Sequence, residues 1–185
     1  MKNTIEFKNF KYLTEKECEL VYFQRNRPEI RQYMVNSESF SYSDHKRFLE
    51  KLKIDDSSLY YLVNFNDLSV AVFCYTDISK SEHTYETGCY FFNDDPSIRY
   101  DITLSSVEVQ LKHGLYYPKI RVKKNNKQAL IFNIMKMDCQ IISEDSEFYY
   151  LKRITDLDPF DRESMSKAKK MLERLSEKYY IIIKD

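Results

Sequence analysis

Glycine is almost absent from this 185-residue chain, which contains only Gly88 and Gly114. An average usage of about 7% would give roughly a dozen. Turns that need a positive φ must therefore be formed by Asn, Asp or Ser, the first two of which tolerate that conformation best after glycine. We expect the two remaining glycines to meet specific geometric requirements.

A net charge and a long apolar run are also lacking. Acidic and basic residues number 29 each, so no overall field attracts nucleic acid or anionic lipid, and we expect neither as a partner. No run approaches the length that a transmembrane helix needs. The first residues mix charge with apolar side chains and lack the core of a signal peptide. These features predict a cytoplasmic globular protein.

The four cysteines lie far apart, at positions 18, 74, 89 and 139, and form no C-x-x-C pair. Apolar neighbours flank each of them, and no histidine stands at metal-ligand spacing. We therefore expect buried free thiols and no metal site. The length allows one well-buried domain with a small addition.

Apolar periodicity predicts an alternation of strands and helices. A capping box begins at Thr14, Pro28 opens a short helix, and Ser43 caps a third helix. Asn66-Asp67 predicts a tight hairpin. Strands are expected at 4–13, 59–65, 68–75, 85–92, 119–122, 139–143 and 147–154, with later helices at 101–113 and from 125 or 126 to 137. Gly88 indicates a bulge or a close approach, and Gly114 suits the left-handed end of a helix.

This order predicts the α/β (α+β) class, a mixed and mostly antiparallel sheet with helices on both faces. Residues 1–155 form the main domain, and residues 156–185 add a helix and a strand. Asp158-Pro159 is a capping pattern, and an apolar stripe follows at three- and four-residue spacing. We expect this helix to pack on its own domain, with a dimer contact as the alternative.

One stretch resembles a known family. The segment Arg-Asn-Arg-Pro-Glu-Ile-Arg-Gln-Tyr-Met at 25–34, followed by Ser43-Asp44-His45 and Phe48-Leu49, is similar to the amino-sugar N-acetyltransferases of the GNAT family. The most similar branch acts on a nucleotide-linked (UDP) 4-amino-4,6-dideoxy sugar in pseudaminic acid biosynthesis. The likeness spans about residues 5–153. It implies a GNAT fold and the transfer of an acetyl group from acetyl-CoA to the amino group of a small substrate.

The resemblance also implies where acetyl-CoA binds. In the family the coenzyme lies where two neighbouring strands part, here 86–92 and 119–122, and Glu86-Thr-Gly-Cys-Tyr matches the family's Glu-x-Gly-x-Tyr. A backbone N–H after a bulge at Gly88 would hold the oxyanion. The implied contacts are Cys89, Tyr90, Phe91, Phe92, Arg99, Ile102, Thr103 and Asn126.

The expected pyrophosphate loop, residues 97–102, departs from the family pattern. Both of its glycines are missing, and Tyr100 and Ile102 place side chains where the pyrophosphate approaches closely. Asp101 adds like charge, and Arg99 is the compensating cation. We therefore expect this loop to bind coenzyme A weakly or differently.

Glu86 is the candidate general base for the amine, and a strand carboxylate paired with a Lys or Arg is the competing interpretation. Asn133 stands where many family members carry a tyrosine that protonates the leaving thiolate, and asparagine has no titratable proton. The candidate substrate contacts are Arg27, Tyr33, Met34, Phe40, His45 and Tyr75. Ordinary packing competes for each of them, and a solvated position on the helix surface is the competing interpretation for His45.

Three hypotheses follow. The first is an N-acetyltransferase with a small-molecule acceptor, and a nucleotide-linked amino sugar is the first candidate. The second is a catalytically silent GNAT-fold domain for binding or assembly, including a homodimer. The third is an acyltransferase that uses another acyl donor, such as a carrier protein.

Overall fold

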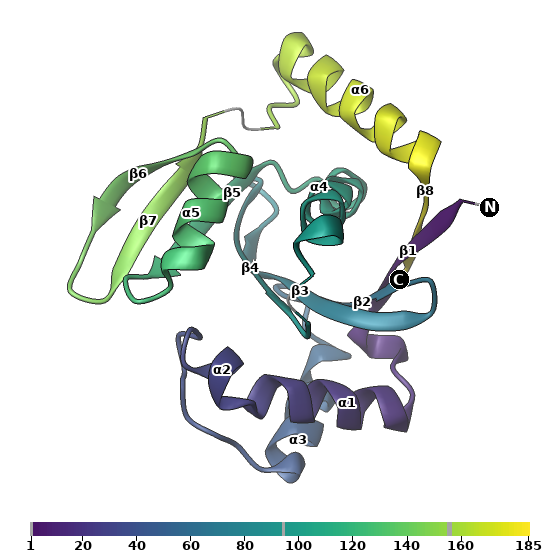
Figure 1. Ribbon diagram of the computed structural model, residues 1–185, viewed down its shortest axis with the longest axis vertical. Coiled ribbons are helices and arrows are strands. Elements are labelled where there is room, and N and C mark those ends of the chain that lie inside the picture. Colours follow the sequence, from purple (N-terminus) through teal and green to yellow (C-terminus); the bar gives the residue numbers. More distant parts are fainter. Residues whose placement is uncertain (1, 94, 155–156) are drawn as a thin grey trace.

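A computed structural model of the chain describes residues 2–93, 95–154 and 157–185. Over these ranges, eight strands form one sheet in the order β6-β7-β5-β4-β3-β2-β1-β8 (Figure 1). The elements are β1 (Asn3–Asn9), η1 (Phe10–Tyr12), α1 (Glu15–Asn26), α2 (Pro28–Arg31), α3 (Tyr42–Leu52), β2 (Leu59–Phe65), β3 (Leu68–Ser79), β4 (Thr84–Phe91), α4 (Pro96–His113), β5 (Tyr117–Lys123), α5 (Lys127–Lys136), β6 (Cys139–Glu144), β7 (Phe148–Arg153), α6 (Arg162–Lys178) and β8 (Tyr179–Lys184).

The sheet is mixed and mostly antiparallel. Only the β4–β5 and β1–β8 neighbours run parallel among the described strands. Helices α1, α2 and α3 cover one face, and α4 lies on the other (Figure 1). Helix α5 packs against β5, β6 and β7 on the α4 side, where it shares Leu104 of α4 as a neighbour. The predicted fold class is confirmed.

Two apolar layers hold the helices to the sheet. On the α4 side, Ile102 and Val109 pack on strand residues that include Phe7 and Tyr85. On the opposite side, Val21 of α1 and the leucines of α3 pack on β2 and β3. Successive strand side chains point to opposite faces, so each strand supplies both layers.

Local signals confirm several predictions. The Thr14 capping box is present at the start of α1, and Asn66 and Asp67 take the positive φ values, 47° and 67°, of a tight hairpin. Gly114 ends α4 in the left-handed conformation with φ 65°. The expected Ser43 cap is wrong, because Ser41 forms a capping box with Asp44 three residues later and α3 begins at Tyr42.

Helix α4 begins five residues earlier than expected. Asp95 is its N-cap and Pro96 occupies the first turn, where proline's missing N–H and fixed φ are favourable. Residues 97–102 are therefore the first two turns of a helix and not a loop.

The C-terminal segment completes the sheet. Asp161, not Asp158, caps α6, and the apolar stripe of α6 packs on α4 through Leu172, Leu175 and Val107. Strand β8 then pairs in parallel with β1, and α6 lies across α4 on the side away from the sheet (Figure 1). A dimer contact through this helix stays a prediction. No helix of the described chain has the length and apolar character needed to cross a membrane.

Candidate active site

Strands β4 and β5 part in the middle of the sheet. Their pairing runs from Thr84 and Tyr117 to Thr87 and Ile120 and then stops. Beyond this point, β4 continues against β3 as far as Phe91, and β5 continues against β7 as far as residue 123. The facing edges of residues 88–91 and 121–123 therefore have no partner among the described strands.

The side chains of β4 divide between two faces at this opening. Tyr90 belongs to the apolar layer under α1 and α3, and Phe91 belongs to the layer under α4. Because strand side chains alternate, Glu86 and Gly88 share the face of Tyr90, whereas Cys89 shares that of Phe91. The parted strands thus have an α1–α3 side that carries Glu86 and an α4 side that carries Cys89.

At Gly88 the strand passes close to the Cys74 side chain and forms no bulge. Its pairing opposite Cys74 is regular, and the irregularity between β3 and β4 lies between Thr76 and Ser79. A Cβ at Gly88 would lie 3.2 Å from Cys74 Sγ, tighter than an ordinary contact. The predicted bulge at Gly88 is wrong, and the free backbone edge comes instead from the departure of β5.

Glu86 is held by an arginine from the next strand. Arg121 Nη2 donates to Glu86 Oε1 at 2.5 Å and Nε donates to the same oxygen at 3.2 Å. The guanidinium also lies 5.2 Å from the ring centroid of Phe148. The paired-carboxylate interpretation thus describes this structure, while a catalytic role for Glu86 stays a proposal. Arg121 was missed from the sequence, where its alternation with the buried Ile120 and Val122 is the available signal.

Arg25 is a second cation on the α1–α3 side. Its Nη2 donates to Asn36 O at 2.9 Å, whereas its Nη1 is buried and has no hydrogen-bond partner among the described residues. Burial lowers the pKa of the guanidinium, whose nearest titratable neighbours include Tyr90 and Cys74. The guanidinium also lies 5.9 Å from the ring centroid of Phe40. Arginine keeps its charge in proteins, so a cation without an ion pair among the described residues lies on this side of the sheet.

Arg27 and Phe40 have structural contacts in this region. Arg27 donates to Phe92 O at 2.9 Å and pairs with Glu29 at 2.7 Å, which ties the α1–α2 turn to the end of β4. Phe40 is bound through its backbone to Asn26 by two hydrogen bonds of 3.1 and 3.2 Å. These contacts place the segment between α2 and α3 beside the parted strands.

The same segment reaches β5. Lys123 Nζ donates to Gln32 O at 3.4 Å, so α2 ends over the far strand of the opening. Tyr33 follows with 38% of its surface exposed, and Met34 is half-buried. Both side chains remain candidates for contact with a substrate.

Two expectations for this side are wrong. Tyr75 has no exposed surface and donates to Ser106 O at 3.4 Å beneath α4, so it belongs to the core and lines no substrate site. His45 is 3% exposed and not solvated. It packs against Tyr22, Phe40 and other aromatic rings, and burial lowers the pKa of its imidazole.

Cys89, Phe91 and Arg99 line the α4 side of the opening. Cys89 is exposed, yet desolvation by the surrounding protein raises the pKa of its thiol to about 11. The Arg99 guanidinium lies 5.0 Å from the ring centroid of Phe91, so a cation stands beside the opening.

Other residues expected to contact the coenzyme point elsewhere. Ile102 has no exposed surface and Phe92 is 4% exposed, while Tyr90 lies on the opposite face of β4. Thr103 donates its hydroxyl to Arg99 O at 2.8 Å. Because residues 102 and 103 lie in the second turn of α4, helix hydrogen bonds engage their N–H groups. Ile102 is therefore a core residue with no group free for the coenzyme, whereas a contact through the Thr103 side chain stays a prediction.

The N-terminus of α4 offers few donors for a phosphate. Pro96 has no N–H, and the Asp95 carboxylate accepts from Ser97 N at 2.9 Å and from Ser97 Oγ at 2.5 Å. Anions bind helix N-termini through unpaired N–H groups and the positive end of the dipole. Here a carboxylate already occupies that position.

Helix α5 supplies no titratable acid at the position expected for one. Asn126 caps the helix by accepting from Ala129 N at 3.1 Å. Asn133 Nδ2 donates to Ala129 O at 2.9 Å, and its Oδ1 lies 4.0 Å from Cys139 Sγ. Both side chains stabilise α5 and its junction with β6.

Comparisons with known proteins identify the fold. No family model matches the chain. It is 28% identical to the acetyltransferase PseH of Campylobacter jejuni strain 81-176, over 80% of this chain and 92% of that protein. The crystal structure of Campylobacter jejuni N-acetyltransferase PseH in complex with acetyl coenzyme A matches with a TM-score of 0.63 and 26% identity, over 80% of this chain and 96% of that chain. The chain has the GNAT fold and is related to PseH.

This relationship confirms the family resemblance carried by residues 25–34. Another solved structure is similar in fold over a larger share of the chain. FdhC, described as a nucleotide-linked sugar GNAT, matches over 94% of both chains with a TM-score of 0.68 and 16% identity. At that identity the match shows the fold alone.

Proposed function

We propose that the chain transfers the acetyl group of acetyl-CoA to the amino group of a nucleotide-linked amino sugar. The observation that carries the proposal is the parting of β4 and β5 one residue beyond Glu86. The relationship to the acetyltransferase PseH and the likeness to its complex with acetyl coenzyme A support it.

The free edge of β4 suits the acyl-bearing arm of the donor. Pantetheine carries two amide groups, and an extended chain with amides can pair with an open strand edge. In this proposal the arm lies between residues 88–91 and 121–123. An N–H of the β4 edge donates to the thioester oxygen, where negative charge develops as the amine attacks.

Glu86 is the proposed base on the acceptor side. The amine nitrogen attacks the thioester carbonyl, the C–S bond breaks, and the nitrogen loses one proton to Glu86 directly or through water. The leaving thiolate takes up one proton. Because Asn133 donates no titratable proton, that proton comes from the amine by way of Glu86 or from solvent. Arg121 is a positioning residue that orients the Glu86 carboxylate.

The cations on this side favour an acceptor that carries negative charge. Arg25 lacks a carboxylate partner among the described residues, and its Nη1 is buried without a hydrogen bond. Lys123 adds a second cation at the far strand. A phosphate oxygen would satisfy the guanidinium, and charge-assisted hydrogen bonds of this kind are strong. This arrangement supports a nucleotide-linked sugar over an amine acceptor that carries no phosphate.

An acetyl-transfer assay with product detection by mass spectrometry tests the proposal. The acceptors are a UDP-linked 4-amino sugar, the same sugar without the nucleotide, and a polyamine. We expect transfer to the UDP-linked sugar and at least tenfold lower kcat/KM for the free sugar. If no acceptor is acetylated while acetyl-CoA binds, the silent-domain hypothesis gains. If acetyl-CoA does not bind at millimolar concentration, the donor assignment fails.

A further inference from the structure

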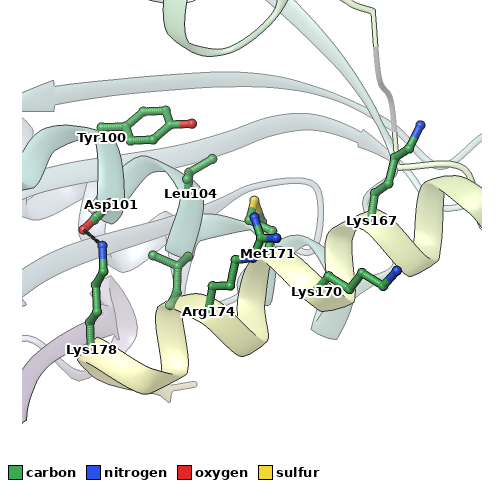
Figure 2. A pocket seen from close by; sticks show the side chains of 9 residues that line it. Tyr100, Asp101, Leu104, Lys167, Lys170, Met171, Arg174 and Lys178 are labelled. Carbon is green, nitrogen blue, oxygen red and sulfur yellow. Dashed lines mark ion pairs between the residues drawn. The ribbon is translucent and has the colours of Figure 1, made fainter.

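A groove of about 480 Å³ lies between α4 and α6. Helix α6 packs on the side of α4 that is turned away from the sheet (Figure 1). Tyr100 and Leu104 line it from α4, and Met171 lines it from α6 (Figure 2). The groove therefore lies apart from the parted strands and is bounded by the C-terminal extension.

The α6 wall carries a row of positive charges. The side chains of Lys167, Lys170, Arg174 and Lys178 line the groove, as Figure 2 shows. Their spacing of three, four and four residues puts them on one face of the helix. Like charges at this spacing repel one another, so a bound anion would relieve a repulsion already present.

The acids nearby neutralise only the ends of this row. Lys178 lies 3.8 Å from Asp101 across the groove, and Lys167 pairs with Glu163 on its own helix at 2.8 Å. Lys170 and Arg174, in the middle, form no ion pair with any residue in the described ranges. The centre of the groove thus has a surplus of positive charge.

The α4 wall offers an aromatic ring. Tyr100 is 39% exposed, and Leu104 and Met171 give the groove an apolar floor beside the cations. An aromatic ring and cations that line the same groove suit a ligand that combines an aromatic base with phosphates.

A phosphate site in the groove would replace the one that the capped start of α4 does not provide. Asp95 and Pro96 leave few N–H donors there for a phosphate. Tyr100 follows Pro96 by four residues, or about 6 Å along the helix axis. The groove thus opens close to the helix end whose donors are already used.

We propose that the α4–α6 groove binds the nucleotide phosphates of the acyl donor. The inference rests on the proposed function. The 3′-phospho-ADP end of coenzyme A has the required chemistry, an aromatic base with phosphate groups. The phosphate of the acceptor belongs, in the proposed function, to Arg25 on the opposite face of the sheet.

Isothermal titration of the full chain with 3′,5′-ADP, UDP and inorganic pyrophosphate tests the groove. We expect K170E to weaken binding of the preferred nucleotide at least fivefold, with R174E acting alike. K169E is the matched control, because Lys169 is the next residue on α6 but does not line the groove. It should change affinity less than twofold. Thermal melting of each variant shows that it folds.

The pattern of ligands tests the donor assignment. We expect 3′,5′-ADP to bind more tightly than UDP, and a preference for UDP would overturn the proposal. Tyr100→Ala should weaken the nucleotide and leave pyrophosphate unchanged. Equal losses in K169E and K170E, or unaltered nucleotide affinity in both K170E and Tyr100→Ala, would overturn the proposal.

A kinetic comparison separates this inference from the proposed function. If the groove holds the donor nucleotide, K170E raises the KM for acetyl-CoA and leaves turnover of S-acetylpantetheine, which lacks the nucleotide, unchanged. A rise in the KM of the acceptor, with that of acetyl-CoA unchanged, would overturn the proposal. Absence of acetyl transfer would refute the proposed function while the titrations still decide the groove.

Discussion

Replacing Glu86 by Gln tests whether its carboxylate removes the proton from the attacking amine. Gln has the same shape and still accepts a hydrogen bond from Arg121, which donates to Glu86 at 2.5 Å and 3.2 Å. The change therefore removes the basic group with little effect on packing. Loss of a general base typically costs about 10²- to 10⁴-fold in rate, so we expect kcat to fall at least a hundredfold.

Arg121→Gln perturbs the same pair from the other side. Only 25% of the Glu86 side chain and 30% of the Arg121 side chain are exposed, so the carboxylate would lose its partner in a half-buried place. Discounted for the solvent that remains, this should cost about 1 kcal/mol of unfolding free energy. Because the base itself is retained, we expect kcat to fall about tenfold or less.

The two variants are compared by thiol release from acetyl-CoA and by urea denaturation. Glu144→Gln is the control, since Glu144 pairs with Lys124 at 3.0 Å and is 56% exposed in its side chain; it should change stability by less than about 0.5 kcal/mol and leave kcat unaltered. If Glu86→Gln keeps more than a third of the wild-type kcat, Glu86 is not the base.

Three further predictions concern neighbouring residues. Gly88→Ala should lower the free energy of unfolding, measured by urea denaturation, by about 1–2 kcal/mol, because the new Cβ lies 3.2 Å from Cys74 Sγ. Adding Cys74→Ala to this variant should restore at least half of that loss. If Gly88→Ala lowers stability equally with and without Cys74, the two side chains do not clash. Burial holds the pKa of His45 below its ordinary 6.5, so the unfolded chain takes up a proton first as the pH falls, and stability is lost from about 6.5 downwards. His45→Phe should reduce this loss between pH 7.5 and 5, and an unchanged pH dependence would show that another group causes it. Arg25→Gln should raise the KM of a phosphate-bearing acceptor about tenfold and leave that of acetyl-CoA unchanged; a matching rise for both substrates would place Arg25 outside the acceptor site.

Much of the fold was predictable because its signals are local. The Thr14 box and the Asn66-Asp67 turn fix backbone geometry through hydrogen bonds and sterics within a few residues. The start of α4 was predicted wrongly, although its signal is also local. Asp95-Pro96 is itself a strong helix start, but the family pattern placed a phosphate loop at 97–102.

The candidate site was less predictable because it depends on register and burial. Glu86 was found from its motif, but Arg121 becomes its partner only because β5 runs parallel to β4 with Glu86 beside Lys119. His45 looked like a surface residue, since a polar side chain near a helix start is usually solvated. Aromatic rings from α1 and the following segment bury it instead.

By itself the sequence determined the alternation of elements, their caps, the family signature at 25–34 and the missing glycines before α4. These follow from residues near one another in the chain, through periodicity, capping and φ preferences. The tertiary structure alone decided where β4 and β5 part, which cation holds Glu86, and that α6 lays a row of positive charges beside Tyr100. Those juxtapositions join segments far apart in sequence, and burial across the whole sheet fixes them rather than any local preference.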